Sequence, residues 1–215
     1  MKTGILFDLD GTLLDTLEDL LDATNYALTQ CGYPVRTLAE LRKFVGNGAE
    51  NQIRMSLPQS CSPEEVQRVL AVYKPYYTTH CQIKTRPYDG VLDALAVLGA
   101  KYPIAVVSNK PDAAVKSLCA QMFPGVYALG EAADCPRKPA PDMVFRACQA
   151  IGADTCVYVG DSEVDVRTAK NAGVPCLSVL WGFRDREEIE AEGGAHFCEK
   201  TEELAEKIEE LIHGK

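Results

Sequence analysis

Short apolar runs alternate with amphipathic stretches along most of this chain. The apolar runs have the length of buried strands: one begins at Ile5, and four more cover residues 104–107, 126–129, 156–159 and 175–179. Apolar positions recur at helical spacing in residues 91–98, 113–122, 143–151 and 164–172. Gly152 and Gly173 follow two of these stretches, as expected just after a helix ends. Strands that alternate with helices predict an α/β fold, with a parallel sheet and right-handed crossovers.

One connection is far longer than the others. Residues 16–87 separate the first strand from the next helix of the sheet, whereas a crossover needs about a dozen residues. This segment has helical patterns of its own at residues 17–30, 38–43, 49–57 and 64–80. We expect an all-α domain at residues 16–87, inserted into a core domain of residues 1–15 and 88–215. Its linkers lie near Asp15-Thr16 and Arg86-Pro87-Tyr88, so it covers the end of the first strand. A cap in that position can exclude water and contact a substrate.

Two carboxylates follow the first strand. Asp8 and Asp10 come directly before Gly11, and ligands in open α/β sheets bind beyond the carboxyl ends of the strands. Two neighbouring acids repel each other unless a cation or a shared proton relieves them. The pair suits a hard cation such as magnesium, with one carboxylate free to attack phosphorus. Taken alone, the segment is better explained as an Asp-Gly turn at a solvated strand end.

Further polar groups follow the later strands. Ser108 and Asn109 come just before a helix, where a hydroxyl, an amide and free N–H groups can bind an anion or simply cap the helix. Lys138 precedes a proline, which excludes it from the following helix. A loop that fixes this ammonium could screen the two carboxylates and bind a phosphoryl oxygen, unless Lys138 is an ordinary exposed lysine.

The run at residues 156–159 ends in Gly160-Asp161-Ser162. Asp161 is a candidate metal ligand. Ser162 and Asp165 fit a variant of the helix capping box, so Asp165 could cap the helix or support the site. Glu163 is expected to face solvent. Each group has an ordinary structural explanation, but their joint occurrence at the strand ends favours chemistry.

These residues together resemble a known family. Asp8-Leu9-Asp10-Gly11-Thr12 resembles the first motif of the haloacid dehalogenase-like superfamily of phosphohydrolases. Ser108, Lys138 and Gly160-Asp161-x-x-x-Asp165 match the second, third and fourth motifs in order and spacing. The resemblance covers residues 3–184. It implies a Rossmann-like core with helices on both faces of the sheet, and a helical cap between the first and second motifs.

The resemblance also implies a reaction. Asp8 is the nucleophile that forms an aspartyl-phosphate, and Asp10 protonates the leaving oxygen and then activates the hydrolytic water. Ser108 and Lys138 hold the phosphoryl group. Phosphoryl transfer depends chiefly on positioning and charge neutralisation, which agrees with these roles. The implied enzyme is a phosphatase acting on small phosphate monoesters.

The implied binding residues extend beyond these four. Mg²⁺ is the implied cofactor, bound by the carboxylates of Asp8 and Asp161 and by the backbone carbonyl of Asp10. Asp165 orients the metal waters or Lys138. The implied substrate contacts are Gly11, Ser108, Asn109 and Lys138, with Asn47 and Gly48 added from the cap.

The branch of the family follows from two features. Asp10 is typical of the phosphatases and phosphomutases and argues against dehalogenation. Val45-Gly46-Asn47-Gly48 resembles the substrate loop of phosphoglycolate phosphatase-like members, although a tight turn between helices would also use these glycines. Phosphoglycolate is therefore one candidate substrate, and pyrophosphate and sugar phosphates, including a phosphomutase reaction, stay open.

Two other classes of function compete with an enzyme. A phospho-accepting signalling module also uses strand-end acids, a hydroxyl and a lysine, but the cap and Asp10 speak against it. An inactive phosphate-binding protein is disfavoured because no motif position is missing.

Composition narrows the partners. The net charge is −9 and no basic stripe occurs, which argues against a nucleic-acid partner. Nine scattered cysteines without a C-x-x-C pair are expected to be small core residues in a reducing cytoplasm. No apolar run approaches the roughly 18 residues of a membrane span, and Met1-Lys2-Thr3 leads straight into the first strand, so we expect neither membrane segment nor signal peptide. The expected partner is a small phosphorylated metabolite, and the oligomeric state is open.

Overall fold

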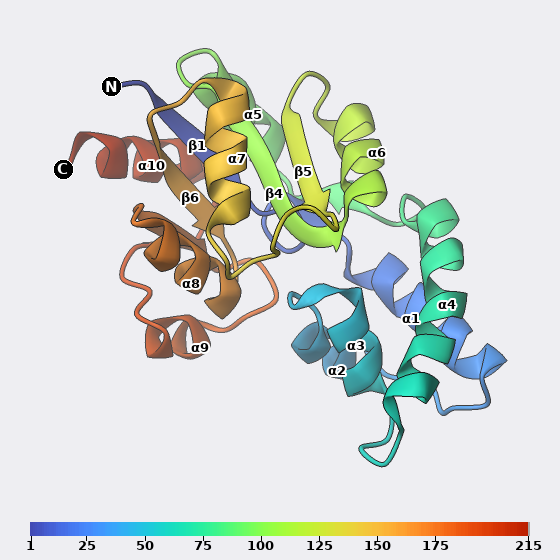
Figure 1. Ribbon diagram of the computed structural model, residues 1–215. Coiled ribbons are helices and arrows are strands. Elements are labelled where there is room, and N and C mark those ends of the chain that lie inside the picture. The colour runs from blue at the N-terminus through green and yellow to red at the C-terminus, as the bar shows by residue number, and fades with distance from the viewer. Residues whose placement is uncertain (215) are drawn as a thin grey trace.

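A six-stranded parallel sheet forms the centre of the molecule in a computed structural model that describes residues 1–214 (Figure 1). The strand order is β5-β4-β1-β6-β7-β8. The strands are β1 (Thr3–Phe7), β4 (Ile104–Pro111), β5 (Tyr127–Glu131), β6 (Thr155–Gly160), β7 (Cys176–Val179) and β8 (Phe197–Cys198). In β1, Ile5 pairs with Ile104 on one side and with Val157 on the other. The predicted parallel α/β fold is confirmed.

Helices cover both faces of this sheet. They are α5 (Val91–Gly99), α6 (Asp112–Met122), α7 (Asp142–Ile151), α8 (Glu163–Ala172), α9 (Arg186–Ala191) and α10 (Leu204–His213), the last preceded by a 3-10 turn at Thr201–Glu203. Successive side chains of a strand point to opposite faces. Accordingly Phe7 joins the apolar cluster that contains residues of α5, α6 and α10, whereas Leu6 joins the cluster formed with α7 and α8. Figure 1 shows α7 in front of the sheet and α5 behind it.

The inserted segment folds into four helices: α1 (Leu17–Gln30), α2 (Leu38–Phe44), α3 (Gly48–Ser56) and α4 (Pro63–His80). We call residues 16–87 the helical unit. Capping boxes at Thr37 and Ser62 fix where α2 and α4 begin. Buried residues such as Leu28, Leu41 and Ile53 pack its interior. In Figure 1 the four helices lie together, on the side toward which the arrowheads of β4 and β5 point.

The two linkers of the helical unit pair with each other. β2 (Leu14–Asp15) and β3 (Arg86–Pro87) form a two-stranded antiparallel sheet, and Arg86 Nη2 lies 3.4 Å from Asp15 Oδ2. The buried carboxylate of Asp19 accepts the N–H groups of Ile83, Lys84 and Thr85 at 2.9 to 3.1 Å. The chain therefore enters and leaves the helical unit at one place, next to the end of β1.

Strand β4 differs from the expectation. It was predicted to end at residue 107, but it runs to Pro111 with a shift of register against β5 between Val107 and Pro111. Ser108, Asn109 and Lys110 therefore occupy an irregular stretch within the strand. Because an irregularity re-aims the side chains of a strand, these residues can point toward the end of β1.

Candidate active site

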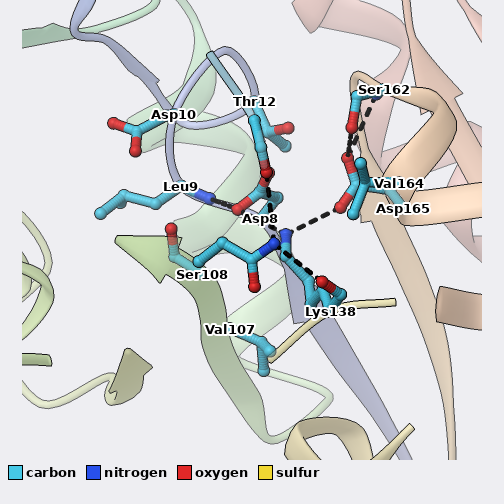
Figure 2. A network of polar contacts seen from close by, with 12 residues as sticks. Asp8, Leu9, Asp10, Thr12, Val107, Ser108, Lys138, Ser162, Val164 and Asp165 are labelled. Atoms are coloured by element: carbon cyan, nitrogen blue, oxygen red, sulfur yellow. Dashed lines mark hydrogen bonds and ion pairs between the residues drawn. The ribbon is translucent and has the colours of Figure 1, made fainter. Parts of the chain in front are cut away.

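The site lies at the carboxyl end of β1, where the topology of the sheet changes direction. From β1 the chain builds β4 and β5 on one side and then returns to β6 on the other, and such a crossover point is where open α/β sheets bind ligands. Asp8 follows β1 directly: its N–H donates to the Val159 carbonyl at 2.8 Å, and its Oδ1 accepts the N–H of Leu9 at 2.7 Å. Figure 2 shows Ser108, Lys138 and Asp165 gathered around it.

Lys138 supplies the ammonium that pairs with Asp8 in the described residues. Its buried Nζ lies 2.9 Å from Asp8 Oδ1 and 2.8 Å from Asp165 Oδ1. The amide of Asn109 donates to the Lys138 carbonyl at 3.0 Å and so fixes the loop. Burial lowers the pKa of Lys138, but the carboxylates of Asp165 and Asp8 raise it more, and the net pKa lies well above its ordinary value. The group stays charged.

Asp165 serves both of the roles that the sequence left open. Its Oδ2 accepts the backbone N–H of Ser162 at 3.1 Å and the Ser162 hydroxyl at 2.7 Å, which completes the capping box of α8. Its Oδ1 accepts from Lys138 and, at 3.3 Å, from the Tyr158 hydroxyl. Gly160 is required beside it, because any side chain there would collide with the Asp165 carboxylate.

Two hydrogen bonds fix the carboxylate of Asp161. Its Oδ2 accepts the N–H of Phe183 at 2.7 Å, and its Oδ1 accepts the Thr12 hydroxyl at 3.3 Å. Gly11 has a φ of 80°, and a side chain at that position would overlap the Asp161 carboxylate. The glycine predicted to contact substrate therefore also makes room for a candidate metal ligand.

The carboxylates of Asp8, Asp161 and Asp165 form a group that could hold a metal ion. One oxygen of each lies within 4.8 Å of the others, and all three residues are buried. Burial raises the pKa of Asp8 to about 7 despite the lowering by Lys138, and burial together with Asp165 and Asp8 raises the pKa of Asp161 well above its ordinary value. When all three carboxylates are ionised, they exceed the single ammonium of Lys138 by two negative charges, and a divalent cation with oxygen ligands would neutralise this excess.

Asp10 has a different environment from Asp8. Its carboxylate points away from Asp8 in Figure 2, and it accepts from Lys110 Nζ at 2.7 Å. Lys110 is buried, with its ammonium 4.8 Å from the ring centroid of Tyr77 in α4. Lys110 lies two residues after Ser108 of the second motif, and no role was predicted for it from the sequence.

A cavity separates these residues from the helical unit. Its volume is about 40 Å³, well below the roughly 300 Å³ at which ligand pockets usually begin. Ser108 lines it from the sheet, and Gly46 and Gly48 line it from the helical unit. Asn47 occupies the N-cap position of α3 without a capping hydrogen bond from its side chain, and it is not among the described residues that border this cavity. The structure therefore brings Gly48, but not Asn47, to the site.

Two side chains of the sheet domain hold the helical unit in this position. Asn109 donates to the Gly46 carbonyl at 3.2 Å. The buried Arg184, which follows β7, donates to the carbonyls of Arg42 and Val45 at 2.8 and 2.7 Å. Its Nε lies 2.9 Å from Glu163 Oε2, so the expectation that Glu163 faces solvent is wrong. Nothing local in the sequence indicates these contacts, because they join residues far apart in the chain.

Two expectations from composition can be compared with the described residues. All nine cysteines are free, and five of them are buried (Cys81, Cys119, Cys135, Cys156 and Cys198). Among the helices of residues 1–214, none is both long enough and apolar enough to cross a membrane.

Comparisons with known proteins agree with this geometry. Residues 5–179 match the family described as haloacid dehalogenase-like hydrolase. A phosphoglycolate phosphatase of Mesorhizobium japonicum is 35% identical over 95% of both chains, and one of Xylella fastidiosa is 33% identical over 86% of this chain and 82% of its own. A solved structure of a candidate phosphoglycolate phosphatase from Lactobacillus delbrueckii subsp. bulgaricus is 38% identical, with a TM-score of 0.90 over 97% of this chain and 99% of that one.

The match spans all the strand ends that carry the polar groups, from Asp8 to Asp161. The relatives share most of this chain's length, so the likeness includes the helical unit as well as the sheet. The chain belongs to the haloacid dehalogenase-like hydrolases, in the phosphoglycolate phosphatase-like group, and is a phosphatase that hydrolyses small phosphate monoesters.

Proposed function

We propose that this enzyme hydrolyses phosphoglycolate in two steps, through an acyl phosphate (aspartyl-phosphate) of the Asp8 carboxylate, with Mg²⁺ as its cofactor. The observation that carries the proposal is the buried group of Asp8, Asp161 and Asp165, whose negative charge exceeds that of its one ammonium partner. Mg²⁺ would be held by the Asp8 and Asp161 carboxylates and the Asp10 backbone carbonyl, and it supplies charge neutralisation at the transferring phosphoryl group.

Asp8 is suited to attack phosphorus. The hydrogen bond from Leu9 and the ion pair with Lys138 hold one carboxylate oxygen, Oδ1, so the other is free to act as nucleophile. Ser108 and Lys138 flank this position and hold the phosphoryl oxygens, with Gly11 and Asn109 nearby. Lys138 is itself aimed by Asp165.

Asp10 is the proton carrier in this proposal. It lies two residues beyond Asp8, lines the cavity, and has 18% of its side chain exposed. It protonates the leaving oxygen in the first step and takes a proton from the attacking water in the second. A group that serves both steps must reverse its role, as general acid and then general base.

The helical unit, residues 16–87, serves as a cap. It covers the cavity beside Asp8, where a bound ester would be shielded from bulk water. The named relatives support phosphoglycolate as that ester. The nine free thiols support work in a reducing compartment such as the cytoplasm.

The test is steady-state phosphate release from p-nitrophenyl phosphate and from phosphoglycolate. Activity should require Mg²⁺, disappear with a chelator, and be lost in Asp8→Asn, which keeps the size of the side chain but cannot form the acyl phosphate. Comparable turnover by Asp8→Asn, or full activity of the wild type in chelator, would refute the proposal.

A further inference from the structure

Lys110 lies on the leaving-group side of the site. If Asp10 protonates the leaving oxygen, a group that contacts the Asp10 carboxylate must border the alcohol that departs. Lys110 Nζ makes that contact at 2.7 Å. Lys138 instead contacts Asp8 and Asp165, on the phosphoryl side. The two buried lysines therefore serve opposite ends of a bound ester.

The helical unit gives this side of the cavity no charge. The residues that line the cavity from the helical unit are Leu20, Val45, Gly46, Gly48, Ala49, Gln52, Tyr73 and Tyr77. The Gln52 amide is already used, because its Nε2 donates to the Thr24 hydroxyl at 2.8 Å. An anionic leaving group would find no cationic partner among these eight residues.

Arg184 also lines the cavity, but its guanidinium is committed. Its Nε pairs with Glu163, and its Nη1 and Nη2 donate to two carbonyls of the helical unit. The ammonium of Lys110 has three donors, of which one is used on Asp10 in the described residues. The Tyr77 ring lies 4.8 Å from its Nζ and the Lys110 side chain is 2% exposed, so the remaining donors are shielded from bulk water. Lys110 is thus the lining cation with donors to spare.

Building on the proposed function, we infer that Lys110 binds a carboxylate carried by the leaving alcohol and makes the enzyme selective for small, carboxylate-bearing phosphate esters. A chain with a net charge of −9 repels such a multiply charged anion until a local cation compensates. A buried, charge-assisted hydrogen bond discriminates strongly. An ester without the carboxylate leaves the remaining donors of the Lys110 ammonium unpaired.

Two esters of nearly equal size test this inference. Phosphoglycolate carries a carboxylate where 2-hydroxyethyl phosphate carries a neutral CH₂OH group. The wild type should prefer phosphoglycolate in kcat/KM by about 10- to 100-fold, the range expected for a hydrogen bond to a charged group. Lys110→Met should abolish most of this preference, and Lys110→Arg should retain part of it. Lys116→Met is the matched control, since Lys116 is an exposed lysine on α6.

The ratio of the two esters is the decisive readout, because loss of the Asp10 contact will slow both reactions. An equal loss on both esters in Lys110→Met, with the preference intact, would overturn the inference. So would a wild type that shows no preference, a result that needs no variant to fold. If the wild type releases phosphate from neither ester with Mg²⁺, the proposed function itself fails.

Discussion

At the scale of residues, Asp8 and Asp10 are distinguished by their partners. They are two positions apart on one strand end, and residue type alone does not separate them. Asp8 pairs with Lys138, which Asp165 holds from the other side, whereas Asp10 pairs with Lys110 beneath the helical unit. In the proposed reaction, Asp8 as nucleophile therefore faces the groups that bind the phosphoryl group. Asp10 as proton carrier faces the side from which the alcohol leaves.

Asp10→Asn should separate these two roles. The amide keeps the size of the side chain but cannot transfer a proton as the carboxyl does, so kcat should fall about 10²- to 10⁴-fold. Mg²⁺ should still bind, because the proposed contact is the backbone carbonyl. The measurement is phosphate release together with the rise in melting temperature on adding Mg²⁺. Loss of that rise in a folded variant would contradict the division of roles.

The motif residues were predictable from the sequence, but their supporting partners were not. Asp8, Ser108 and Asp161 come just after apolar runs that indicate strands, and Lys138 lies in a loop marked by prolines. Lys110 and Arg184 depend on contacts across 100 and more residues, which only the packed fold defines. Arg184 is buried, although arginines are mostly exposed in folded proteins.

At the scale of elements, the end of α2 is the joint between the two parts of the molecule. Arg184 donates to the carbonyls of Arg42 and Val45 there, and Arg42 Nη2 reaches back to the Gly182 carbonyl at 3.2 Å. Carbonyls at the end of a helix lack partners within the helix, and a cation beside them is stabilising. These reciprocal contacts hold the helical unit against the sheet domain.

Arg184→Gln should therefore weaken closure. Removing the guanidinium leaves Glu163 and two carbonyls without their partner, and each lost charge-assisted bond costs about 1.5 to 3 kcal/mol. We expect KM to rise by about tenfold or more, with a smaller change in kcat. Arg186→Gln, two residues away on the exposed start of α9, is the control. Equal KM values for the two variants would show that Arg184 does not hold the cap.

The elements themselves were predicted well where they are long. α1 spans Leu17–Gln30 as the pattern indicated, and α5 to α8 differ from their predicted ranges by one residue at an end. The two-residue strands β2, β3 and β8 and the six-residue α9 were missed, because so few residues carry no measurable periodicity. β4 extends beyond its apolar run into Ser108, Asn109 and Lys110. These residues are buried although they are polar, so the hydrophobic pattern did not include them in the strand.

At the scale of the whole molecule, an acidic protein encloses an acidic site and must still admit an anion. The three-carboxylate group lies between the sheet and the cap, and its excess charge opposes folding unless a cation is present. Metal binding and folding should therefore be linked.

Mg²⁺ should raise the melting temperature of the enzyme. A ligand at one hundred times its Kd stabilises the folded state by about 2.7 kcal/mol, which is about 5 to 10 °C for a chain of this size. Asp161→Asn should lose this rise, while Asp134→Asn, a change at an exposed carboxylate, should keep it. Thermal unfolding with Mg²⁺ and with a chelator measures both. A full rise in Asp161→Asn would remove that residue from the metal site.

The central claim is that phosphate is transferred to Asp8 before water releases it. The direct measurement is rapid acid quenching of the enzyme during turnover of a ³²P-labelled ester, followed by identification of the labelled peptide. We predict label on Asp8 of the wild type, more label in Asp10→Asn because hydrolysis is slowed, and none in Asp8→Asn. Turnover without labelled protein in both the wild type and Asp10→Asn, or label on another residue, would contradict the account.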